Sequence, residues 1–483
     1  MEQVGVQLSP LRIYRTGNAL IMAGFILGLG LTFALASTGS VPYLIVLPAA
    51  ILGVITVGIL LAYPLLNLMI AILGFVLMAS NEAGFQVIEI AYAAYLFAFL
   101  LTWFLRHAIS GRSEILTEKP DLALTLFLGL LPATLVLTYF FHGDFLVAFS
   151  ELISLSMLLV YFPVKHTVVH HRIGPKLMLI TVVAMSVVVS IVNSFEYASD
   201  LSNATHLSHI AGSRVVENDA LLTIGALMSL PLLVYARRPI SLLLSASAVA
   251  LTFAGLIMTQ ARGAWLAFML GMFVLILLVR TPERIKILTI GTIISVLILG
   301  IGYILIGPFL NVVIEGIVER FGTIATSFTQ DLSLVNRFRE TQAVLERIVL
   351  NPLIGYGPGV SYVFYDIVHQ STDTDSFVHN GYIGLWYKYG LWGLGLVLYF
   401  WYSTVKLGLR AFRSDATDYW TRLAGLAGAI PLVALTITTL VGNPFFLKNQ
   451  LFIIAIAAGL AVGAGERSSN LTATSSVATK NHT

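Results

Sequence analysis

Apolar residues occur along this chain in long unbroken runs that short polar segments separate. Fourteen runs are each about 20 residues long. They lie at 18–36, 42–60, 62–79, 86–105, 121–141, 145–163, 176–194, 219–235, 240–258, 263–279, 285–305, 382–403, 422–441 and 448–465. At a helical rise of about 1.5 Å per residue, such a run crosses the hydrocarbon core of a bilayer. The runs are apolar on every side and lack period-two alternation, which predicts transmembrane helices and excludes a membrane β-barrel.

The pattern therefore predicts an all-α polytopic membrane protein with about 14 transmembrane helices and one large helical loop outside the cytoplasm. The expected organisation is a cytoplasmic N-terminus at 1–17, eleven helices over 18–306, an extracytoplasmic loop at 307–378, three helices over 379–465 and a disordered cytoplasmic tail at 466–483. The tail is rich in Ser, Thr and Ala, a composition that buries little apolar surface. No cleavage site clearly follows the first run, so we expect a retained helix rather than a removed signal.

Composition supports a membrane location. Of the 483 residues, 58% are hydrophobic and 11% charged, whereas a soluble domain carries about 25% charged residues. The mean hydropathy is +0.90. The chain has no cysteine, which excludes disulfides, a thiol nucleophile and a thiolate metal site. A net charge of +3 is too small to indicate nucleic acid as a partner.

The distribution of Lys and Arg predicts the orientation. With fourteen spans, both termini and every second loop lie on one side, and that side holds 19 of the 27 Lys and Arg residues. Positive charges accumulate on the cytoplasmic side of membrane proteins. We therefore expect cytoplasmic termini, and a loop at 307–378 that faces the outside.

Within this outer loop the sequence predicts a helix that Ser333 or Asn336 caps and that ends near Leu350, with Phe338, Val344 or Leu345, and Ile348 on one stripe. A glycine-rich segment, Gly355-Tyr356-Gly357-Pro358-Gly359, follows it. Its glycines permit positive φ and close approach by a ligand, which makes Gly355 and Gly357 candidate substrate-binding residues; a simple turn explains them equally well.

Two cationic positions stand at the membrane boundary. Arg262 lies where one apolar run ends and the next begins, and a charge in that position is costly unless it has a function. A snorkelling arginine that binds lipid phosphate is the alternative. His379, followed by Asn380, lies directly before the span at 382; it is a functional candidate or an interfacial histidine with a satisfied hydrogen bond.

Arg262, Arg337 and His379 are all expected on the outer side, at the depth of lipid headgroups. Arginine binds phosphate oxygens in bidentate fashion, so this set suits a lipid-linked diphosphate and would stabilise the charge of a diphosphate leaving group. Arg214, Arg320, Arg339 and Asn380 are further candidates for substrate binding. Arg337 and Arg339 are two helical positions apart and point in different directions, so we expect one of them to face the site.

The ordered motifs resemble those of the O-antigen ligase and polymerase superfamily of bacterial envelope enzymes. The resemblance rests on Gln260-Ala261-Arg262-Gly263-Ala264-Trp265 at a helix entry, on Asn336-Arg337 ahead of Asn351-Pro352-Leu353-Ile354-Gly355-Tyr356-Gly357, and on His379-Asn380-Gly381-Tyr382 with Tyr389-Gly390-Leu391. It covers about residues 240–405. Many relatives carry Trp at the position of Thr341, which weakens the local match.

The resemblance implies a GT-C-like glycosyltransferase in the bacterial plasma membrane. Such an enzyme moves a glycan from a polyprenyl-diphosphate carrier to an acceptor on the outer face, by direct displacement, without a cofactor or a metal. Asp373-Thr374-Asp375 is formally an Asp-x-Asp motif, but the family gives it no metal role. Lipid A-core, a growing polysaccharide and a protein all stay open as acceptors.

Two further alternatives stay open. A flippase for lipid-linked glycans would also suit fourteen spans, although it would need charged residues inside its helices, where only Glu89 and Glu151 stand out. His379 could act as a general base towards the acceptor hydroxyl or donate a hydrogen bond to the diphosphate; its position at the membrane slightly favours the second role. Glu340, Asp366, Asp373 or Asp375 could supply a base instead.

Overall fold

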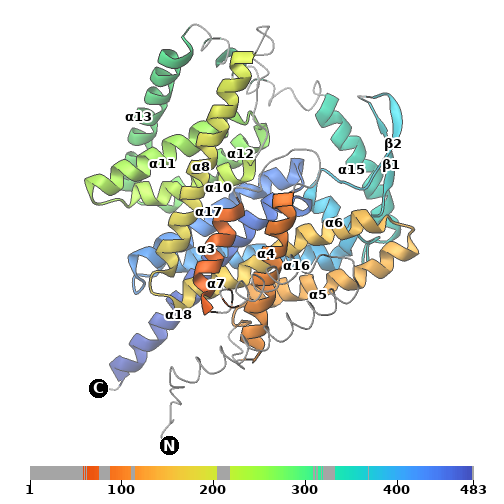
Figure 1. Cartoon of the computed structure of the whole chain (residues 1–483), viewed down its shortest axis with the longest axis horizontal. Helices are drawn as coiled ribbons and strands as arrows, with labels where there is room; N and C mark the ends of the chain where they lie inside the picture. The colour runs from red at the N-terminus through yellow and green to blue at the C-terminus, as the bar shows by residue number, and fades with distance from the viewer. Residues whose placement is uncertain are drawn as a thin grey trace, which may run out of the picture. The chain divides into compact units, whose positions relative to one another are not determined.

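The residues that the structure describes fold almost entirely into α-helices (Figure 1). The computed structural model describes residues 62–75, 87–109, 115–203, 218–307, 332–367 and 369–480, with isolated positions 58, 60, 311, 314–316, 318 and 322. Two compact units are distinguished: Met1–Met78 with Glu82–Glu114, and Ala79–Asn81 with Ile115–Thr483. In the smaller unit α3 (Pro64–Gly74) packs against α4 (Val87–Ile109), where the Tyr92 hydroxyl donates to the Ala71 carbonyl at 2.6 Å.

The described part of the larger unit contains the other helices and a β-hairpin. In chain order they are α5 (Lys119–Phe140), α6 (Phe145–Ser156), η2 (Met157–Val160), α7 (Tyr161–His170), α8 (Gly174–Asn203), α10 (Asp219–Val234), α11 (Pro239–Met258), α12 (Arg262–Leu278), α13 (Thr281–Ile306), α15 (Leu332–Leu350), β1 (Tyr362–Asp366), β2 (Ser371–Asp375), α16 (Gly381–Arg413), α17 (Tyr419–Val441), η3 (Pro444–Phe446) and α18 (Lys448–Lys480).

Eight helical segments among the described residues are long and apolar enough to cross a membrane. They are Ala91–Ile109, Lys119–Phe140, Phe145–His170, Gly174–Ser199, Pro239–Met258, Thr281–Ile301, Tyr419–Val441 and Lys448–Thr472. Each coincides with a run expected to span, so the protein is an all-α, multi-pass membrane protein. A count of fourteen and a GT-C-like fold stay predictions.

The six other expected spans differ from these eight in length, in composition or in being outside the described part. The runs at 18–36 and 42–60 lie outside it, apart from positions 58 and 60. The run at 62–79 corresponds to α3, with 11 residues, and two more correspond to α10 and α12, with 16 and 17 residues. The run at 382–403 lies in α16, a helix of 33 residues rich in Tyr and Trp.

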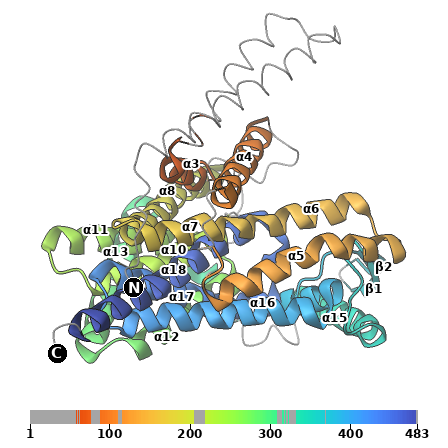
Figure 2. The same ribbon diagram turned by 90° about the horizontal axis from the view of Figure 1, so that it is seen from below.

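Helices α7, α16, α17 and α18 form the centre of the larger unit, and α16, α17 and α18 run side by side (Figure 2). The apolar residues from Leu451 to Ala464 of α18 are buried. Small residues let these helices approach closely: a Cβ on Gly408 would lie 2.7 Å from the Gly425 carbonyl oxygen. Lipid tails are as apolar as the side chains, so the hydrophobic effect does not drive helices together inside a bilayer. Close van der Waals packing of this kind stabilises their association instead.

The described part of the outer loop folds onto the start of α16 (Figure 2). The antiparallel strands β1 and β2 pair Tyr362 with Asp375 and Asp366 with Ser371. A small core buries aromatic and aliphatic side chains of α15, β1, α16 and the segments between them; it consists of Val344, Ile348, Tyr356, Val360, Tyr362, Phe364, Val378 and Tyr387. This core fixes α15 against α16.

Helix α15 begins earlier than expected and presents a different stripe. It starts at Leu332, so Asn336 lies inside it, and the side-chain Oδ1 of Asn336 accepts a hydrogen bond from the Ile367 amide at 3.1 Å. Its end at Leu350 agrees with the expectation. Val344 and Ile348 are buried, whereas Phe338 is exposed, because the packed face continues N-terminally through Glu340.

The C-terminal tail differs from the expected disorder. Helix α18 continues to Lys480, because polar contacts anchor its first residues beyond the apolar run. Glu466 pairs with Lys165 at 2.8 Å, and Arg467 donates to the carbonyls of Val168 and His171 at 3.0 and 2.7 Å. Lys165 in turn pairs with the buried Asp121 at 2.5 Å. This network joins α5, α7 and α18.

Candidate functional site

The imidazole of His379 is held by a buried carboxylate. Its Nδ1 lies 2.6 Å from Oε2 of Glu340, and the His379 backbone amide donates to Oε1 of the same carboxylate at 2.5 Å. The His379 side chain is 37% exposed and that of Glu340 only 3%. Phe377 stands edge-on to the imidazole, with the ring centroids 5.2 Å apart. Both the position and the rotation of the ring are therefore set by Glu340.

Glu340 belongs to the packed face of α15. It precedes Val344 and Ile348 at steps of four residues, and all three side chains are buried against the core of the outer loop. Burial raises the pKa of the Tyr362 hydroxyl most, and the charge of Glu340 raises it further. A buried carboxylate is stable only when hydrogen bonds satisfy it, and here the two donors of His379 do so.

The end of α17 brings the other motifs to this dyad. Arg337 donates from Nη1 to the Val441 carbonyl at 2.6 Å. The Gly381 amide donates to the Gly442 carbonyl at 3.2 Å, and Asn443 donates from Nδ2 to the Val378 carbonyl at 2.7 Å. The residues on both sides of His379 are thus tied to the same turn that Arg337 contacts.

Arg262 approaches this turn from α12. It is the first residue of that helix, and a Cβ on the next residue, Gly263, would lie 3.6 Å from the Val441 side chain. The preceding Gln260 has a positive φ of 49°, which reverses the chain between α11 and α12. Trp265 fixes that reversal by donating to the Leu256 carbonyl at 3.0 Å. The start of α12 at Arg262 and the side chain of Arg337 therefore lie at the same turn of the chain.

The weaker cationic candidates separate into two groups. Arg214 and Arg320 lie outside the described residues. Arg339 is exposed on α15, on a different side from Arg337, which is half-buried. The expected divergence of these two neighbours is therefore seen, and Arg337 is the one that lies at the turn of Val441.

Asn380 is the N-cap of α16. Its side-chain oxygen accepts from the amides of Tyr382 and Ile383, each at 3.1 Å. The cap closes the first turn of α16 directly after His379 and holds the helix start beside the dyad. Contact of Asn380 with a substrate stays a prediction.

The glycine-rich segment packs against helices rather than around an open site. Gly355 and Gly357 have φ of 80° and 92° and are buried. A Cβ on Gly355 would lie 2.5 Å from the Gly390 amide, and one on Gly357 would lie 2.7 Å from the Thr138 amide. The close approach for which these glycines are needed is therefore to α16 and α5.

This packing also provides hydrogen-bond donors for carbonyls at a kink in α16. At Gly390 the φ is 65° and the ψ is −175°, so the helix is interrupted. The Tyr387 and Lys388 carbonyls, left without helical donors, accept from the amides of Tyr356 and Gly357 at 2.8 and 2.9 Å. The glycine segment thus supplies the backbone hydrogen bonds that a kinked helix lacks inside a membrane.

An ion pair of Glu151 with Lys388 lies beneath this segment. Lys388 is fully buried and its ammonium stands 4.6 Å from the centre of the Phe446 ring. The Gly359 amide donates to the other oxygen of Glu151 at 3.3 Å. Sequence reasoning noted Glu151 as a charge inside a span but did not find its partner, because 237 residues separate the two.

The sequence does not predict the contact of Glu340 with His379. From the sequence Glu340 is only one of four carboxylates that could act as a base, and the fold brings it to the imidazole. An available signal was its spacing, since an acidic residue four positions before Val344 and eight before Ile348 occupies the apolar stripe of a helix. Among the residues that the structure describes, no group of three or more His, Asp or Glu side chains could hold a metal ion.

Comparison with known families finds a match that covers part of the chain. Residues 246–398 match the family model described as O-antigen ligase, and the matched segment contains Arg262, Arg337, Glu340 and His379. No curated protein matches the chain. Residues 246–398 thus match the O-antigen ligase family, which is the resemblance that the order of the motifs predicted.

Proposed function

We propose that the protein transfers a glycan from a polyprenyl-diphosphate carrier to an acceptor hydroxyl, on the outer face of the bacterial plasma membrane. The observation that carries the proposal is the dyad of His379 and Glu340, with Arg337 and the Arg262 turn on the adjoining end of α17. The O-antigen ligase family supports the same class of glycosyltransferase.

The transfer breaks the bond between the anomeric carbon and the diphosphate and forms a bond from that carbon to the acceptor oxygen. The acceptor loses a proton, and polyprenyl diphosphate leaves with the bonding electrons. Direct displacement inverts the configuration at the anomeric carbon and needs no covalent intermediate. Arg337 and Arg262 are suited to hold the diphosphate oxygens and to stabilise the charge that develops on them.

The Glu340 contact supports the base role of His379 over the diphosphate role that the sequence slightly favoured. A carboxylate at Nδ1 selects the tautomer with hydrogen on Nδ1, which leaves the Nε2 lone pair to accept a proton. Among the described residues, the ring's hydrogen-bond partner is Glu340 at Nδ1. A base placed in this way contributes about 10²–10⁴-fold to a rate.

Buried charges do not favour the flippase alternative. Glu151 pairs with Lys388, and Asp121 pairs with Lys165. Charges that neutralise each other in a packed interior do not line a polar path for a glycan.

The proposal is tested with the purified full-length protein and a synthetic polyprenyl-diphosphate oligosaccharide. Release of polyprenyl diphosphate is measured with lipid A-core, with a second donor molecule or with a protein as acceptor. Release that depends on one of these acceptors identifies it. For His379→Ala we expect lost turnover with donor affinity intact; loss of both would assign His379 to the diphosphate, and loss of neither would remove it from the site.

A further inference from the structure

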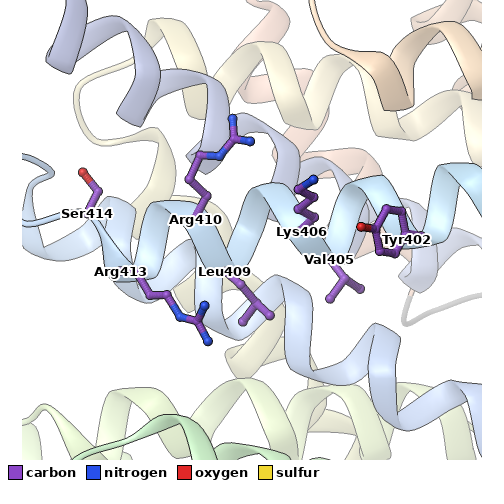
Figure 3. Close-up of a pocket in the computed structure, with 7 residues that line it drawn as sticks. All are labelled: Tyr402, Val405, Lys406, Leu409, Arg410, Arg413 and Ser414. Carbon is purple, nitrogen blue, oxygen red and sulfur yellow. The ribbon is translucent and has the colours of Figure 1, made fainter.

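The C-terminal end of α16 carries a groove outside the site described above (Figure 3). Its cavity volume is about 610 Å³, within the usual range of small-molecule sites. The lining contains three cations, Lys406, Arg410 and Arg413, and no carboxylate. All three are exposed in the described structure.

The groove combines two rows of side chains that repeat every four residues along the helix. One row consists of Tyr402, Lys406, Arg410 and Ser414, and its Lys406 ammonium lies 5.8 Å from the centre of the Tyr402 ring. The other row consists of Val405, Leu409 and Arg413. In Figure 3 Lys406 and Arg410 extend to one side of α16, and Val405, Leu409 and Arg413 to the other.

The cations of the groove are not neutralised by ion pairs of the described residues. Asp415, the nearest acidic residue in the sequence, pairs with Arg422 at 3.8 Å. Burial raises the pKa of Glu118 and the charge of Arg410 acts to lower it, but the two side chains form no ion pair among the described residues. The three clustered cations are therefore available to bind an anion.

The depth of the groove indicates which anion. Over the expected span 382–403, α16 rises about 30 Å, close to the hydrocarbon thickness. In this expected topology His379 lies at one membrane surface, and Arg410 and Arg413 lie beyond the other end of the span. Val405 and Leu409 then lead from the cations towards the middle of the bilayer, where an acyl chain would lie. A free phosphate has no part that fits this apolar row.

We propose that this groove binds one anionic phospholipid, with its phosphodiester at Arg413, an acyl chain along Val405 and Leu409, and Lys406 and Arg410 adding positive charge on the adjoining row. Tyr402 and Lys406 stand at the depth where aromatic and basic residues anchor helices to the interface. The proposed lipid site lies at the membrane surface opposite His379. It does not depend on glycan transfer, so each of the two proposals can be tested without the other.

The test measures binding of phosphatidylglycerol to the purified full-length protein in detergent, by native mass spectrometry and by the shift in melting temperature. The groove variant combines Lys406→Gln, Arg410→Gln and Arg413→Gln. A matched control, Arg172→Gln with Arg237→Gln and Arg280→Gln, removes the same charge from exposed positions outside the groove. Since each basic residue near an anionic lipid strengthens binding severalfold, we expect the groove variant to bind at least about tenfold more weakly and the control to bind like wild type.

Three results would overturn the proposal. They are unchanged binding by the groove variant, equal losses in the groove and control variants, and displacement of the lipid by millimolar inorganic phosphate, which would show a site for free anions. Phosphatidylcholine, which has no net charge, should not compete. If the triple variant does not fold, Arg413→Gln alone provides the same comparison, with Arg237→Gln as its control.

Discussion

Glu340 sits between a hydrophobic core and the exposed ring of His379, and this position defines its chemistry. The carboxylate cannot turn away, because Val344 and Ile348 on the same face are packed. It therefore acts as a positioning residue that holds the imidazole through Nδ1 and the backbone amide. A catalytic base is commonly oriented by a third group in this way.

At the residue scale, we expect Glu340→Gln to lower turnover by about 10²-fold, because an amide no longer enforces the tautomer with hydrogen on Nδ1. Donor affinity should stay within about twofold of wild type, since Glu340 does not reach the diphosphate. The measurement compares donor binding with single-turnover rates. Equal losses in binding and turnover would show that the variant disrupts the fold of the loop instead.

Arg337 and Arg339 offer a matched pair on one helix. Arg337→Lys keeps the charge but removes the guanidinium fork, and we expect about tenfold to a hundredfold weaker donor binding. Arg339→Lys should have little effect, because that side chain is exposed on another side of α15. Donor binding by both variants is compared in one assay. Similar donor binding by the two variants would show that Arg337 does not bind the diphosphate.

Arg262→Ala is tested by its turnover. Turnover equal to wild type would show that Arg262 contacts lipid and does not bind the donor.

His369, at the tip of the hairpin, is expected to titrate above an ordinary histidine. The Asp366 carboxylate, 2.9 Å from its Nδ1, raises the pKa of His369 through a hydrogen bond and its charge. A raised pKa in the folded state means that this contact stabilises the hairpin below the ordinary pKa and that the gain is lost as the pH rises through the folded pKa. Nuclear magnetic resonance of labelled histidine should show this pKa fall in Asp366→Asn; an unchanged pKa would contradict the contact.

At the element scale, the kink of α16 and the glycine segment depend on each other. A Cβ on Gly390 would lie 2.2 Å from the Leu353 carbonyl oxygen, and the φ there is 65°. We expect Gly390→Ala to destabilise the protein by about 2 kcal/mol or more and to lower activity, since the start of α16 carries the dyad. Gly395→Ala, in the same helix with nothing within 4 Å of the added Cβ, is the control. Equal melting temperatures for the two variants would argue against the kink as a constraint.

Elements were predicted with uneven success for a physical reason. Long apolar runs determine a helix locally, and eight of them were confirmed as candidate spans. The hairpin of β1 and β2 was not predicted, because its polar strand Ser371–Asp375 has no apolar alternation and is held by its partner. The helix of the tail was missed because Glu466 and Arg467 are anchored by residues about 300 positions away.

At the scale of the whole molecule, orientation rests on the Lys and Arg distribution. The native chain has no cysteine, so single cysteines report accessibility without background. In intact cells we expect an impermeant thiol reagent to label Ser371→Cys and not Ala416→Cys, both of which are exposed positions. The reverse pattern would overturn the topology, and with it the outer location of the site.

The sequence by itself determined the class of the protein. Hydrophobic runs, the scarcity of charge and the order of short motifs depend on composition and on near neighbours. They sufficed to predict a multi-pass helical protein with a segment that matches the O-antigen ligase family. They also selected Arg262, Arg337 and His379 as candidates. Only the tertiary structure decided which partners these residues have. Glu340 with His379, Arg337 with Val441 and Glu151 with Lys388 are contacts between segments 39 to 237 residues apart, and no local pattern encodes which distant segments will pack together.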